Sequence, residues 1–90
     1  MSDDFKAVLK EMFSKRAEEI HTEKGLSQEE MAELLHVTPR AYNDLKQGRY
    51  CFSLLPAMFL LSEEDNDWVM DFLRDFRRAA EEIERRRGLA

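Results

Sequence analysis

The sequence predicts an all-α fold of five helices, and composition, apolar spacing and helix-end residues all point that way. Of the 90 residues, 43% are hydrophobic and 37% are charged, and only three are Gly and two are Pro. This balance argues against disorder and against a turn-rich all-β domain. Apolar residues recur at intervals of three and four, and no segment alternates as a strand does. A chain of this length suffices for one small domain, so we expect residues 1–90 to form a single unit.

The first two helices are predicted from an apolar stripe and from capping residues. Residues 3–24 carry apolar side chains on one helical face, and Gly25 is a natural stop after them. Ser27 and Glu30 have the spacing of a capping box, in which each side chain bonds the backbone of the other. A short second helix is therefore expected over about residues 28–35.

The third helix is expected to start at Thr38 and Pro39, as N-cap and first helical residue, and to cover residues 39–47. Its apolar residues share one face. The opposite face is polar and consists of Arg40, Asn43, Asp44 and Gln47. Such a face either meets solvent only or serves as a recognition surface.

The last two helices carry more apolar surface than a small domain readily covers. The helix over residues 53–61 is apolar nearly all round, so we expect it to be covered on more than one side. The amphipathic helix over residues 66–87 has apolar residues at heptad spacing, namely Val69, Phe72, Phe76, Ala79 and Ile83. This stripe packs either on the domain's own core or on a second copy. Because the core of a 90-residue chain is limited, we expect a homodimer through residues 53–61 and 66–87.

The segment from Gly25 to Gly48 resembles the Cro/lambda-repressor (Xre-like) helix-turn-helix family. The resemblance rests on the run GLSQEEMAELL, on Val37-Thr38 after it and on the closing Leu45-Lys46-Gln47-Gly48. It implies a five-helix, lambda-repressor-like domain with its helix-turn-helix over residues 27–48. It also implies a bacterial or phage regulator of transcription that binds double-stranded DNA as a dimer.

The same resemblance implies a set of DNA contacts. Gln28, at the start of the second helix, would contact a phosphate, and the helix over residues 39–47 would read the major groove. There Arg40 suits guanine, Asn43 suits adenine and Asp44 suits cytosine. The full set of candidate DNA-binding residues is Gln28, Thr38, Arg40, Asn43, Asp44, Lys46 and Arg49, with the last two on phosphates. Arg40 and Asp44 are four residues apart, so the alternative is that they pair with each other.

The net charge of −5 leaves a second class of function open. A protein-interaction module, or an antitoxin-like protein, would keep this fold with weak or no DNA binding. The excess acid lies mainly in residues 63–90, however, so a reading face elsewhere need not be acidic.

Catalysis, metal binding and membrane insertion are not expected. The chain shows no nucleophile motif and no phosphate-binding glycine loop, and His21, His36 and Cys51 are not spaced as metal ligands. No cofactor is therefore expected. The single cysteine excludes an internal disulfide and favours the reducing cytoplasm. No secretory leader is expected, and the longest uncharged run, residues 50–62, is too short to cross a bilayer.

Overall fold

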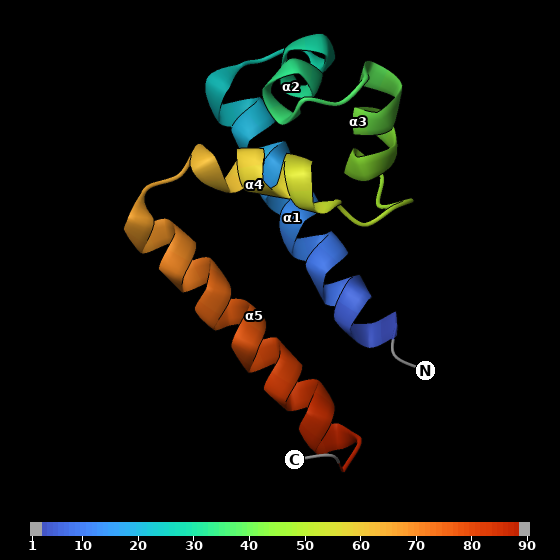
Figure 1. The fold of residues 1–90 in the computed structure, drawn as a ribbon, viewed down its shortest axis with the longest axis vertical. Coiled ribbons are helices and arrows are strands. Elements are labelled where there is room, and N and C mark those ends of the chain that lie inside the picture. Colours follow the sequence, from blue (N-terminus) through green and yellow to red (C-terminus); the bar gives the residue numbers. More distant parts are fainter. Residues whose placement is uncertain (1–2, 89–90) are drawn as a thin grey trace.

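The computed structural model describes residues 3–88 and confirms the all-α prediction (Figure 1). The helices are α1 (Asp3–Lys24), α2 (Gln28–Leu35), α3 (Pro39–Lys46), α4 (Leu54–Ser62) and α5 (Asn66–Arg86). Helix α2 packs against α3 and α4, and α1 contacts both α3 and α5. In Figure 1, α5 leaves this cluster and runs back in the direction opposite to α1. The helix-turn-helix segment therefore lies at one end of the molecule and the free ends of α1 and α5 at the other.

The predicted capping interactions set the starts of α2 and α3. The Ser27 hydroxyl accepts from the Glu30 amide at 3.0 Å, and the Glu30 carboxylate accepts from the Ser27 amide at 2.8 Å, which confirms the capping box. The Thr38 hydroxyl accepts from the Ala41 amide at 3.0 Å, with proline in the first turn of α3. Helix α3 ends at Lys46, one residue earlier than expected, because Gln47 forms its C-cap.

The turn between α2 and α3 depends on a left-handed residue. His36 has φ 60° and ψ 42°, and its amide bonds back to the carbonyls of Ala32 and Glu33. Side chains with a β-carbon enter this region at a cost, although histidine does so more often than most. The imidazole of His36 stacks on the ring of Phe59 in α4, with 3.9 Å between ring centroids. This contact fixes the turn against the rest of the fold.

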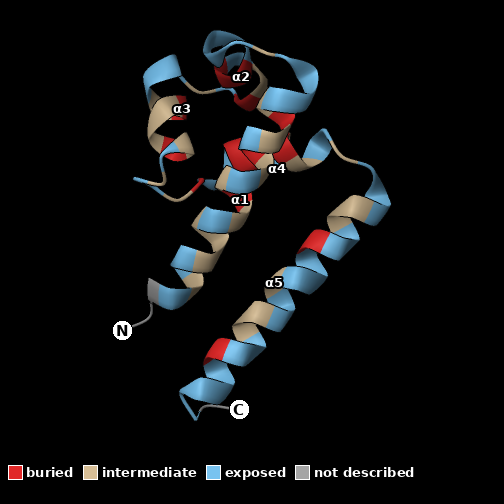
Figure 2. Cartoon of the chain, turned by 180° about the vertical axis from the view of Figure 1, so that it is seen from behind, coloured by how far each residue is buried: buried red, intermediate tan, exposed pale blue. Residues whose placement is uncertain are grey.

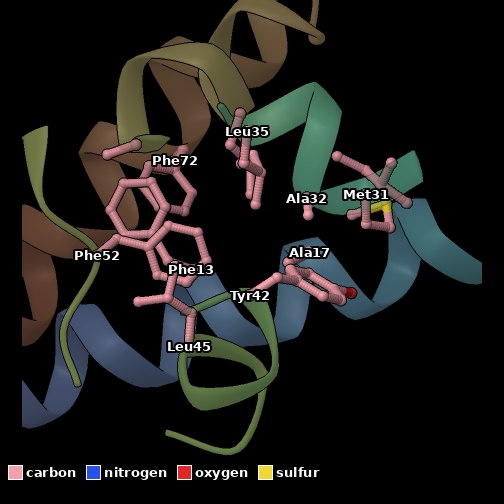
Figure 3. Close-up of a cluster of buried hydrophobic side chains, with 12 residues drawn as sticks. Phe13, Ala17, Met31, Ala32, Leu35, Tyr42, Leu45, Phe52 and Phe72 are labelled. Carbon is pink, nitrogen blue, oxygen red and sulfur yellow. The ribbon is translucent and has the colours of Figure 1, made fainter. Parts of the chain in front are cut away.

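The hydrophobic core is shared by all five helices (Figure 3). Ala17 of α1 and Ala32 of α2 are almost fully buried within it. Phe13 lies at the centre of an aromatic group, stacked on Phe52 at 5.3 Å and edge-on to Phe72 at 4.9 Å. These contacts join α1, the segment before α4, and α5.

Within residues 3–88, α4 is covered on one side only, so any further cover has to come from outside these residues. Pro56, Ala57 and Leu60 are buried, but Leu54, Leu55 and Met58 are 77%, 60% and 51% exposed. The physical reason is the arrangement of the helices, since α2 packs on α4 and no described helix covers its outer face. An apolar outer face is left in contact with solvent.

Helix α5 is likewise only partly covered, as its many exposed residues in Figure 2 show. Of the heptad stripe, Phe72 and Ile83 are buried, while the other three members are half-buried. The stripe therefore packs in part on the chain's own helices, chiefly α1. Met70 and Leu73, beside the stripe, remain 56% and 47% exposed.

The start of α5 is attached to α1 by a cluster around Arg16. The guanidinium Nε donates to the Glu64 carboxylate at 2.6 Å, and its carbon lies 5.1 Å from the centre of the Trp68 ring. Glu19 and Glu23 accept from the same guanidinium at 3.0 and 3.4 Å. This cluster fixes the position at which α5 departs from the rest of the fold.

Candidate nucleic-acid interface

Helix α3 packs on the core by one edge and leaves the opposite edge outside. Tyr42 is fully buried and Leu45 is 7% exposed, so these two side chains hold α3 against α1 and α2. The Tyr42 ring lies 6.4 Å from the ring of His21 in α1. Both views of the ribbon show α3 at the side of the molecule away from α5 (Figures 1 and 2).

The polar edge of α3 is accessible, most of all in its first turn. Thr38 and Arg40 are exposed, and Asn43 is half-buried. Arg40 has no hydrogen-bond or ion-pair partner among residues 3–88. The Asn43 side-chain oxygen accepts from the Gln47 amide nitrogen at 3.3 Å, a contact between two groups of the same edge. Arg40 is thus an exposed cation that can bind an external acceptor.

Asp44 pairs with Arg49, not with Arg40. The Arg49 Nη1 atom lies 2.8 Å from Asp44 Oδ1, and the Arg49 amide donates to the Asp44 carbonyl at 3.0 Å. The chain turns back after α3 and brings Arg49 to this carboxylate. This geometry leaves Arg40 available and gives Asp44 a partner already.

The C-terminal end of α3 is anchored on α1. The Ser14 hydroxyl donates to the carbonyl of Leu45 at 2.9 Å. Lys46 Nζ lies 3.8 Å from a carboxylate oxygen of Glu18, a loose ion pair at a half-exposed site. Of the other candidates, Gln28 is exposed at the start of α2. The structure therefore places every candidate residue on the accessible surface of α2, α3 or the segment after α3.

Two polar atoms are buried beneath α3 without hydrogen-bond partners among the described residues, namely Tyr42 Oη and His21 Nδ1. Burial, followed by the nearby charge of Glu18, raises the pKa of Tyr42 above its ordinary value. The ring is buried at the contact of α1 and α3, so the folded state favours the neutral, protonated phenol over the phenolate.

The structure offers no other chemical centre in residues 3–88. No group of three or more His, Cys, Asp or Glu side chains there is arranged to hold a metal ion. Within the same residues, no helix combines the length and the apolar character needed to span a membrane.

A family model described as helix-turn-helix matches residues 19–58. The matching residues are similar to the Cro/C1-type helix-turn-helix family. The match extends from the end of α1 to the middle of α4 and includes both α2 and α3. The helix-turn-helix family that this model describes is a DNA-binding regulatory family and not an enzyme family. The comparison with curated proteins and the comparison with solved structures gave no match.

One cationic group near this helix-turn-helix was not identified from the sequence. Lys6 and Lys10 of α1 lie beside Arg49 around a common hollow. The sequence pattern that could have identified them is a spacing of four residues: Lys6, Lys10, Ser14 and Glu18 follow one another at this interval and therefore lie in one row along α1.

Proposed function

We propose that the protein is a sequence-specific transcription regulator that reads the major groove of DNA with α3. The observation that carries this proposal is Arg40, which is exposed in the first turn of α3 and has no partner among residues 3–88. Recognition helices contact base edges chiefly with their N-terminal residues. Arginine there matches the two acceptors of guanine with a bidentate pair of hydrogen bonds.

The other candidate residues divide by role. Thr38 and Asn43 lie on the same helix as Arg40 and would add contacts in the groove. Gln28, with the amides at the start of α2, suits a phosphate. Lys46 and Arg49 also suit phosphates, although each already has a carboxylate nearby, at 3.8 and 2.8 Å. These two would exchange a carboxylate for a phosphate on binding.

The uncovered apolar surface supports a homodimer through α4 and α5. Its large side chains are Leu54, Leu55, Met58, Met70 and Leu73, each about half exposed or more. A second copy that packs on these side chains would remove them from water. Two copies would place two α3 helices in successive major grooves, about 34 Å apart on a near-palindromic site. In this proposal residues 1–90 act as one DNA-binding unit with α5 as its dimerisation helix.

The test is selection of bound duplexes from a random pool, followed by binding of Arg40→Ala to the selected site and to a scrambled one. We expect a loss of about 1–3 kcal/mol on the selected site and a much smaller loss on the scrambled site. Lys15→Ala is the matched control, because Lys15 is an exposed cation of α1 and belongs neither to α3 nor to the proposed dimer surface of α4 and α5. An unchanged ratio of the two affinities would remove Arg40 from base reading. Absence of duplex binding by the unaltered protein at low salt would favour the protein-interaction or antitoxin-like function.

A further inference from the structure

A surface hollow of about 380 Å³ lies between the first half of α1 and the segment that follows α3. Its lining consists of Lys6, Ala7, Lys10, Arg49, Tyr50 and Cys51. Three of these six side chains are cationic and none is a carboxylate, in a chain whose net charge is −5. By contrast, the hollow between α1 and α5 is lined by both signs of charge, including Glu19 and Asp75. The first hollow is thus a local concentration of positive charge.

The cations of this hollow are available for a ligand. Lys6 and Lys10 have no ion-pair partner in the described part of the chain, and Lys6 is exposed. Arg49 shares its charge with Asp44, and its side chain is still 56% exposed. Tyr50, 63% exposed, adds a phenol that can donate to an anion.

The hollow continues directly from the C-terminal end of α3. Lys6, Lys10, Ser14 and Glu18 are spaced by four residues, so they form one row along α1. Ser14 bonds the carbonyl of Leu45, and Glu18 lies at Lys46. At 1.5 Å per residue, Lys10 and Lys6 stand about 6 and 12 Å further along the axis from Ser14. The two lysines of this row therefore lie beyond the C-terminal end of α3, toward the start of α1.

We propose that this hollow binds the sugar-phosphate backbone of the DNA strand that borders the groove entered by α3. The proposal rests on the proposed DNA-binding function and adds Lys6, Lys10 and Tyr50 to the contact surface. Charge selects the occupant, since the lining holds two lysines without an ion-pair partner in the described residues and an arginine shared with Asp44, and it contains no carboxylate. Contacts of this type position a protein on the duplex and carry no sequence information.

The experiment measures duplex binding of the full chain by fluorescence anisotropy between 50 and 300 mM salt. The variants are Lys6→Gln, Lys10→Gln and the double variant. Each lost phosphate contact is expected to reduce the slope of log K against log salt by about 0.9, and the double variant by about 1.8. Affinity at 0.1 M salt should fall roughly 3- to 10-fold per lysine, equally for the selected and the scrambled duplex.

Lys15→Gln is the matched control. Lys15 is another exposed lysine of α1, but it lines the hollow that faces α5. We expect its slope to equal that of the unaltered protein. If Lys6→Gln and Lys10→Gln behave like Lys15→Gln while Arg40→Ala still loses specificity, the backbone contact is wrong and the proposed function stands. If no variant and no unaltered protein binds duplex, the proposed function itself fails. Saturable binding of inorganic phosphate in the hollow, with an unchanged DNA slope, would show a small-anion site and would also overturn the proposal.

Discussion

The ion pair between Arg16 and Glu64 gives the sharpest prediction about stability. It joins residues 48 positions apart through an Nε–Oε2 distance of 2.6 Å. The two side chains are only 15% and 10% exposed, so water screens the pair weakly. The hydrogen bond that Arg16 donates to Glu64 raises the pKa of Arg16, against the opposing effect of burial. The pair therefore holds the segment before α5 on α1 through a charged contact.

We expect Glu64→Gln to lower the free energy of unfolding by about 1–2 kcal/mol. A hydrogen bond to a charged group contributes about 1.5–3 kcal/mol, and the amide that replaces the carboxylate retains about 0.5–1 kcal/mol of it. Arg16 also keeps Glu19 at 3.0 Å, which limits the loss. For a domain of this size the midpoint temperature should fall by about 4–15 °C. Urea unfolding and thermal melts followed by circular dichroism measure both quantities.

The adjacent residue provides the control. Glu63 pairs with Lys24 at 3.7 Å, and the two side chains are 34% and 49% exposed. Exposed pairs contribute little, so Glu63→Gln should change stability by less than about 0.5 kcal/mol. A double-mutant cycle with Arg16→Met isolates the coupling of Arg16 to Glu64. Equal effects of the two Glu→Gln changes, or a coupling near zero, would refute the reasoning.

Two further predictions concern the buried tyrosine and the exposed leucines. Tyr42→Phe removes a hydroxyl that has no partner among the described residues, so urea unfolding should show a gain of about 1 kcal/mol. Because burial raises the pKa of Tyr42, the folded state keeps a proton that the unfolded state loses above pH ~10. Stability of the unaltered protein should therefore fall as pH rises beyond that value, and Tyr42→Phe should fall less steeply. Leu55→Asp combined with Leu73→Asp should convert a dimer to a monomer in sedimentation without loss of helicity, since both side chains are exposed; an unaltered protein that is already monomeric would contradict this.

The helix pattern was predictable because its causes are local. The capping box at Ser27 and Glu30, and the Thr38-Pro39 start, act within one helical turn, and α1 and α2 have the expected bounds. Burial of Tyr42 followed from the apolar spacing of α3. Local pattern therefore fixes which edge of α3 faces inward.

Contacts that depend on the path of the chain outside the helices were not predictable. Spacing within α3 left an Arg40–Asp44 pair open as an alternative, but the return of the chain after Gly48 brings Arg49 to Asp44 at 2.8 Å. The apolar character of α4 predicted cover on more than one side, yet periodicity does not say whether that cover comes from the same chain. The Lys6–Arg49 hollow likewise depends on how α1 lies beside the end of α3.

The net charge of −5 is compatible with DNA binding because many acidic side chains are paired or lie along α5, while several basic side chains have no acidic partner in residues 3–88. Several carboxylates are held by cations within the fold, such as Glu64 by Arg16, and others lie along α5. Arg40, Lys6 and Lys10 have no carboxylate partner in residues 3–88. The molecule measures 43 × 29 × 20 Å, and charges separated by more than about 10 Å are largely screened at 0.1 M salt. A phosphate that approaches α3 therefore meets the local cations more strongly than the acids of α5, which lies on the side of the molecule away from α3. Lowering the salt concentration lengthens the screening distance. Both the attraction of DNA phosphates to the local cations and their repulsion by the acids of α5 should then increase. The salt dependence of DNA binding by the Lys6→Gln/Lys10→Gln variant measures the balance of these two effects.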